Sequence, residues 1–162
     1  MTIEATTDRR SQIMLLSIRP RHVAKILDGT KTVELRRGRP VIVPGQPLAI
    51  YSTTPDAAVV ALGRVSRIEV ASPSALWDTV NEVVGIGRGE FDDYFRGAMT
   101  ATGLHLSDIR ALSVPISLTE MRTMGPFQPP QTWHFLDKLR VSRLFGDHPA
   151  TAALSHLIEV AS

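Results

Sequence analysis

Short apolar runs separated by turn residues dominate the first half of the chain. A continuous apolar run predicts a first strand at 14–18, and β-branched or alternating segments predict strands at 32–36, 48–53 and 59–70. Gly63 interrupts the last of these and predicts a bulge or bend there. Two further strands are expected in the second half of the chain, over 100–106 and 109–114.

Helical spacing and cap residues lie between these strands. Pro20 suits a first helical position and Gly29 a helix end, while Ser72 and Ser117 are typical N-caps. The second serine forms a capping box with Glu120. We therefore expect helices over the ranges 20–29, 72–83, 90–96, 117–125, 131–140 and 149–160, the last of them amphipathic.

Strands and helices do not alternate regularly along the chain, which argues against a doubly wound parallel sheet. The pattern favours an α+β fold, a small mixed β-barrel of five or six strands decorated with short helices. A C-terminal amphipathic helix would then pack on the barrel or pair with a second copy, and packing is favoured because an exposed apolar stripe needs a partner.

The composition is that of an ordinary globular domain. The chain has 162 residues, 43% of them hydrophobic and 21% charged. No apolar run approaches the roughly 18 residues that a membrane span needs, and the polar start has no signal-peptide core, so a cytoplasmic location is expected. The absence of cysteine excludes disulfides, zinc–thiolate sites and thiol nucleophiles, and the five histidines show no metal-ligand spacing.

Positive charge is concentrated in one segment although the net charge is only +2. Seven arginines and lysines lie between positions 19 and 39, opposed by Asp28 and Glu34 alone. Such an excess could hold a phosphate backbone, and on charge alone it fits a solvated basic face at least as well.

The most informative run of the chain spans 29–36. Side chains two apart on a strand share a face, so Glu34 and Arg36 should project together near Lys31, with Val33 and Leu35 on the opposite face. A donor and an acceptor beside a cation suit a nucleobase or an anion. A lysine that merely points into solvent is the alternative for Lys31.

Two other segments offer candidate ligand contacts. Tyr51 and Thr53 share a strand face, and Tyr51 would join Glu34 in one pocket if its strand neighbours 32–36. Its ring could stack on a base, although a half-buried strand aromatic is equally ordinary. Thr132 at an expected helix start could hold an anion, or could be a routine cap.

Taken together, these motifs resemble the ASCH domain family of the PUA-like superfamily. The resemblance rests on Gly-x-Lys-x-x-Glu-x-Arg at 29–36, on Ser17-Ile18-Arg19-Pro20 before it, and on Tyr51-Ser52-Thr53-Thr54-Pro55 after it. The resemblance includes the segment 127–132 as well. We therefore expect a flexible leader at 1–13, an ASCH/PUA-like domain at 14–136 and a C-terminal helical extension at 137–162.

The resemblance implies a barrel whose cleft binds RNA or a modified nucleoside. We expect no cofactor or metal, and a monomer or homodimer. Some relatives degrade single-stranded RNA, others hydrolyse the amide of acetylated cytidine, and others regulate transcription or translation. The implied ligand-binding set is Arg19, Lys31, Glu34, Arg36, Tyr51, Thr53 and Thr132, with Lys31, Glu34 and Tyr51 catalytic if the protein is an enzyme. Ala57 stands where ribonuclease-like relatives often have lysine, which weakens the case for that route.

Overall fold

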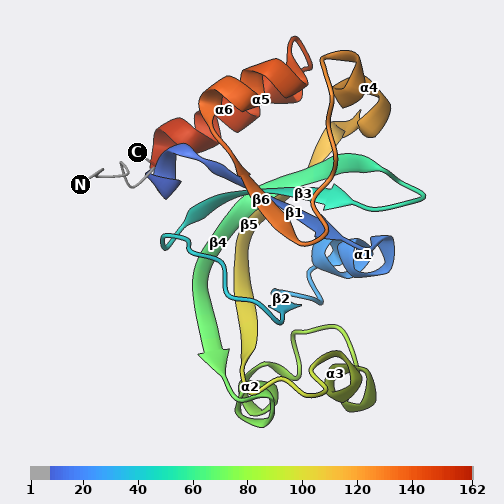
Figure 1. The fold of residues 1–162 in the computed structure, drawn as a ribbon, viewed down its shortest axis with the longest axis vertical. Helices are drawn as coiled ribbons and strands as arrows, with labels where there is room; N and C mark the ends of the chain where they lie inside the picture. The colour runs from blue at the N-terminus through green and yellow to red at the C-terminus, as the bar shows by residue number, and fades with distance from the viewer. Residues whose placement is uncertain (1–7, 162) are drawn as a thin grey trace.

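A computed structural model describes residues 8–161 of the chain. Its core is one mixed sheet of six strands in the order β2-β5-β4-β3-β1-β6, curved into a half-barrel (Figure 1). The strands are β1 Ile13–Ile18, β2 Val33–Arg36, β3 Gln46–Ser52, β4 Ala58–Ala71, β5 Ala101–Ser117 and β6 Trp133–Leu136. Only β1 and β3 pair in parallel, and every other pair in the sheet is antiparallel.

The helices other than α1 lie in two groups at opposite ends of this sheet, and α1 lies beside its middle. A short 3-10 turn, η1 (Arg9–Ser11), precedes β1, and the helices are α1 Pro20–Asp28, α2 Pro73–Val80, α3 Arg88–Tyr94, α4 Leu118–Thr123, α5 Lys138–Phe145 and α6 Ala150–Ala161. In the view of Figure 1, α4, α5 and α6 lie above the sheet, and α2 and α3 lie below it at the far ends of β4 and β5. The predicted α+β fold, a small mixed barrel of five or six strands with short helices, is confirmed, and the six strands form a half-barrel.

Local sequence signals account for several of the helix ends. Pro20 occupies the first turn of α1, and Gly29 ends the helix with a φ of 86°. Ser72 caps α2 by accepting a hydrogen bond from the Ala75 N–H, and Ser117 and Glu120 form the expected capping box on α4. These predicted helix ends are confirmed. Each depends only on residues a few positions apart, so the sequence alone is enough to predict them.

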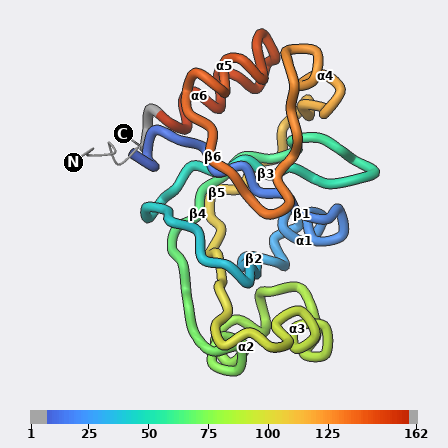
Figure 2. Tube along the Cα trace, viewed as in Figure 1, coloured from blue at the N-terminus to red at the C-terminus, as the bar shows by residue number. Residues whose placement is uncertain are grey.

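The long strands β4 and β5 bend together. A Cβ at Gly63 would lie 2.4 Å from the end of the Ile109 side chain and 3.0 Å from the Ser107 carbonyl oxygen, so a larger residue would force these neighbours to shift. The strand pairing shifts register between Leu62 and Arg64. The predicted bulge at Gly63 is confirmed. The two strands expected at 100–106 and 109–114 are instead one strand, β5, which continues through Asp108 at a φ of 53° (Figure 2).

The helix expected at 131–140 is wrong. The segment forms β6, which pairs with β1 antiparallel, and then α5. Asp137 separates the two elements, because its side chain accepts a hydrogen bond from the Arg140 N–H and so caps a helix that begins at Lys138. A non-local strand partner therefore overrode the local helical pattern before Asp137.

Three apolar clusters fill the fold. We call the largest the helix-covered core; it includes Leu136, Phe145, Leu154 and Ile158 and lies between α4–α6 and the sheet. The predicted amphipathic helix at the C-terminus is α6, and its packing on the sheet through Leu154 and Ile158 is confirmed. Residues 1–7 of the expected leader lie outside the described part of the chain. No helix among residues 8–161 is long and apolar enough to cross a membrane.

Candidate functional site

A cavity of about 740 Å³ lies between α1, β2 and α3. Six of the seven residues expected to bind ligand line it, namely Arg19, Lys31, Glu34, Arg36, Thr53 and Thr132. They come from four separate segments, the start of α1, the loop and strand 31–36, the end of β3 and the loop before β6. Tyr51 is the seventh and is placed elsewhere, as described below.

The sequence around β2 aims its charged side chains at this cavity. Val33 and Leu35 are buried in an apolar cluster with residues of α2 and α3, so the alternation of the strand turns Glu34 and Arg36 the other way. Before the strand, the Lys31 N–H donates to the carbonyl of Lys25, which folds the chain back after Gly29. The predicted shared face of Glu34 and Arg36 is confirmed.

Glu34 and Arg36 form a buried ion pair with part of its hydrogen-bonding capacity unused. Arg36 Nη1 lies 2.8 Å from Glu34 Oε1, and Arg36 Nη2 donates to the Ser17 carbonyl at 2.7 Å. Glu34 is only 5% exposed. Yet Glu34 Oε2 and Arg36 Nε are buried without a hydrogen-bond partner in the structure. A carboxylate oxygen and an N–H without partners are costly in a folded protein, so they mark this wall of the cavity as a place for a polar ligand.

Lys31 is buried beside this pair. It is 3% exposed, and its Nζ donates to the Val84 carbonyl at 2.7 Å, so the lysine does not point into solvent. Burial lowers the pKa of Lys31 from its usual 10.5, an effect that nearby Glu34 opposes. The lysine thereby ties the loop between α2 and α3 to the cavity and keeps an ammonium close to the carboxylate.

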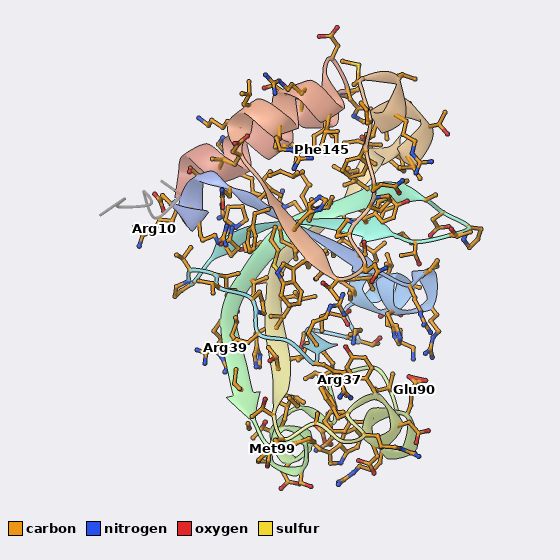
Figure 3. The ribbon with its side chains drawn as sticks, in the orientation of Figure 1. Arg10, Arg37, Arg39, Glu90, Met99 and Phe145 are labelled. Carbon is orange, nitrogen blue, oxygen red and sulfur yellow. The ribbon has the colours of Figure 1, made fainter. Side chains whose placement is uncertain are left out.

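The rim of the cavity between α1 and α3 carries an ion pair and a histidine. Arg21 Nη1 lies 2.8 Å from Glu90 Oε1, and Figure 3 shows Glu90 on the side of α3 that faces α1. The hydrogen bond from Arg21 lowers the pKa of the Glu90 carboxyl. Next to them, burial lowers the pKa of His22, and its Nδ1 has no partner.

Two strand ends and a loop close the other side of the cavity. Ser17 Oγ donates to the Pro130 carbonyl at 2.7 Å, and the Ser17 N–H donates to the Thr132 carbonyl. The Thr53 N–H donates to the carbonyl of Ile18. Thr132 thus lines the cavity from a loop, and the expectation that it opens a helix with free N–H groups is wrong.

Tyr51 does not join Glu34 in the cavity. Its strand, β3, pairs with β1 and β4, whereas β2 pairs with β5 at the far side of the sheet. The Tyr51 side chain is 3% exposed and packs in the helix-covered core, where burial raises the pKa of its phenol. Tyr51 was expected in the cavity only if its strand neighboured 32–36. The two strands are not neighbours, so the prediction that Tyr51 stacks on a base in this cavity is wrong.

Ala57 and the basic segment also take defined places. Ala57 follows β3 with a φ of 46° and is not among the residues that line the cavity. Arg37 donates hydrogen bonds to the carbonyls of Tyr94 and Arg96 and so ties β2 to α3 (Figure 3). Part of the positive charge in the segment 19–39 therefore serves the fold.

Several cavity residues were missed by the sequence analysis, and the most prominent are Ser17, Arg21, His22, Glu90, Asp93 and Tyr94. Ser17, Arg21 and His22 flank Arg19, so the neighbourhood of that arginine was a usable signal. Glu90, Asp93 and Tyr94 come from α3, which reaches the cavity only through contacts distant in sequence. Within residues 8–161 no three His, Asp or Glu side chains gather as a metal-binding group.

Comparisons with known proteins point to one set of relatives. No protein-family model matches the chain. It is 29% identical over 138 residues to an ASCH domain-containing ribonuclease of Zymomonas mobilis, which covers 85% of this chain and 91% of that protein.

Two similar solved structures come from the same organism. A crystal structure of ASCH from Zymomonas mobilis has a TM-score of 0.76 at 29% identity and covers 83% of this chain and 94% of that one. A serine-to-alanine variant of the Zymomonas protein gives a TM-score of 0.77 at 29% identity, covering 85% of this chain and 95% of that one. The similarity therefore extends over most of both chains in sequence and in fold.

Proposed function

The chain belongs with the ASCH domain family, and on that premise we propose that it binds RNA or a modified nucleoside in the cavity between α1, β2 and α3. The observation that carries the proposal is the buried Glu34–Arg36 pair, which leaves one carboxylate oxygen and one guanidinium N–H without partners. The edge of every nucleobase presents donors and acceptors side by side, so a base can match both groups.

The size and charge of the cavity support this ligand class. A volume of about 740 Å³ lies within the range of small-molecule and cofactor pockets, and it suits one nucleotide. Arg19 and Arg21 stand at the start of α1, where a phosphate attached to a base in the cavity would meet positive charge. A ligand-sensing regulator of transcription or translation would use the same contacts.

Hydrolysis of RNA is the second candidate, and two observations favour it. The relative in Zymomonas mobilis is named as a ribonuclease, and burial lowers the pKa of Lys31. A lysine with a lowered pKa has a larger neutral fraction, which can act as a base or nucleophile. Glu34 would orient or deprotonate the attacking hydroxyl or water, and Arg36 would stabilise the developing oxyanion.

Ala57 separates this chain from the pattern of ribonuclease-like relatives with lysine at that position. A methyl group can neither donate a hydrogen bond to a phosphate nor move a proton. Hydrolysis here would therefore depend on Lys31, Glu34 and Arg36, and acetylated cytidine, whose amide is cleaved without a phosphate contact, is the other substrate to test.

One experiment distinguishes these functions. The purified protein is incubated with labelled single-stranded RNA and separately with acetylated cytidine, and binding and product are scored in the same samples. The matched variant is Lys31→Met, which keeps the length of the side chain without its ammonium. We expect RNA binding that weakens with salt and weakens further in the variant. Product that disappears in the variant would identify an enzyme, and wild-type protein that neither binds nor cleaves would contradict the proposal.

A further inference from the structure

His22 is the histidine that lines the cavity, and the other four, all within the described residues, lie elsewhere. It sits in the first turn of α1, directly before the buried Val23. Its Nδ1 is buried and has no hydrogen-bond partner in the structure. Since no protein group bonds to this nitrogen, its hydrogen-bonding capacity is left for a ligand.

Charged groups surround His22 from every side of the cavity. Glu34 faces it from β2, Glu90 from α3, Lys31 from the loop before β2, and Arg21 is its neighbour on α1. Arg19, Arg36 and Asp93 complete the charged lining. The two nearby glutamates and the two nearby cations act in opposite directions, and burial has the largest effect, which lowers the pKa of His22 below 6.5.

We propose that His22 is a ligand-contacting residue whose neutral imidazole accepts a hydrogen bond from an uncharged N–H or O–H of the bound nucleotide. The inference rests on the proposed function and deepens it by dividing the work among the cavity residues. The guanidinium groups of Arg19 and Arg21 meet phosphate oxygens, and the imidazole meets the base or the ribose. A neutral imidazole offers one acceptor and one donor, whereas lysine and arginine offer donors only.

The proposed contact of His22 makes ligand binding depend on pH. Protonation turns both ring nitrogens of His22 into donors and adds a positive charge next to Lys31 and Arg21. The acceptor contact is then lost. Binding of a nucleoside that carries no phosphate should therefore weaken as the pH falls through the lowered pKa of His22.

The test compares a phosphate-free nucleoside, cytidine, with a single-stranded RNA oligonucleotide by NMR titration. His22→Ala removes the imidazole, and His22→Asn keeps an uncharged hydrogen-bonding group that does not titrate. The matched control is His156→Asn, at an exposed position of α6. We expect His22→Ala to weaken cytidine binding about threefold to tenfold, in line with one lost hydrogen bond. His22→Asn should bind with intermediate affinity and lack the loss of affinity that accompanies protonation of the imidazole, while His156→Asn keeps the wild-type profile.

The outcomes separate the two proposals. If wild-type protein binds the probes and the His22 variants match it in affinity and pH profile, the role of His22 is wrong and the proposed function stands. If wild-type protein binds neither probe, the proposed function fails and this inference fails with it. Thermal unfolding of each variant shows whether a loss of binding comes from a loss of folded protein, and His22→Asn decides the question if His22→Ala does not fold.

Discussion

The helix-covered core and the cavity are built on one sheet, yet they bury opposite kinds of side chain. The helix-covered core is filled by apolar residues such as Leu136, Phe145 and Leu154. The cavity wall instead buries Lys31 and Glu34 at 3% and 5% exposure. Burying a charged group lowers the stability of the fold unless hydrogen bonds and ion pairs offset the loss of its hydration. Glu34 Oε2 has no hydrogen-bond partner in the structure. The difference indicates that the first region holds the fold together and the second is kept for a ligand.

The largest change in stability is expected for a substitution in the helix-covered core. Leu154 on α6 is fully buried, so Leu154→Ala should lower the free energy of unfolding by about 2–5 kcal/mol. Urea denaturation measures this change. RNA binding by the remaining folded protein should equal that of wild type. A loss of RNA affinity per folded molecule would show that the two regions are coupled.

Substitution in the cavity should have the reverse consequence. Glu34→Gln keeps the shape of the side chain and removes its charge, and we expect RNA or nucleoside affinity to fall about 10- to 100-fold, the range for a hydrogen bond to a charged group. The matched control is Glu69→Gln. Glu69 lies outside the cavity, and its carboxylate already bonds to Thr79 and His105.

Equal losses in Glu34→Gln and Glu69→Gln would contradict the assignment of the cavity. Such a result would mean that RNA responds to the overall charge of the surface and not to the buried carboxylate. Binding measured by fluorescence anisotropy at constant salt separates the two cases.

The sequence predicted what depends on neighbouring residues. Pro20 and Gly29 delimit α1, and alternation through Val33 and Leu35 correctly placed Glu34 and Arg36 on one face. It did not reveal which strands are neighbours, because β2 pairs with β5, about seventy residues further along the chain, and that pairing is decided by tertiary packing.

The errors at the site have the same origin. Tyr51 was placed beside Glu34 on the assumption that β3 neighbours β2, but two strands, β5 and β4, lie between them in the sheet. Glu90 was not predicted, because α3 meets α1 only in the folded chain, whereas His22 lies three residues after Arg19 and could have been found from that neighbourhood. Local motifs therefore predicted the charged residues Lys31, Glu34 and Arg36 in the cavity. The residues that α3 adds to the rim could not be predicted, because long-range packing places that helix.

A third prediction concerns the buried ammonium. The pKa of Lys31 is lowered in the folded protein, so between that value and 10.5 the unfolded chain binds more protons than the folded one. Stability should therefore rise with pH in this window, and Lys31→Met should remove that contribution. Urea midpoints measured as the pH approaches 10.5 give the slope. An unchanged slope in Lys31→Met would show that Lys31 does not titrate in this way.

The smallest effect is expected at the rim. Arg21 and Glu90 pair at 2.8 Å, but both side chains are largely exposed, and exposed pairs contribute little to stability. Arg21→Gln should change the unfolding midpoint no more than Arg67→Gln, which removes the ion pair between exposed Arg67 and Glu69 on β4. RNA affinity should fall in Arg21→Gln alone. Equal RNA affinity in the two variants would remove Arg21 from the binding surface.

The central claim is that the ligand enters the cavity between α1, β2 and α3, and mapping backbone amide shifts on titration with single-stranded RNA tests it most directly. We predict that the shifted amides cluster at 17–22, 31–36, 90–94 and 131–132, segments that line the cavity. The amides of α5 and α6 should stay in place. Shifts concentrated on α5 and α6, or no shifts at saturating RNA, would contradict the account.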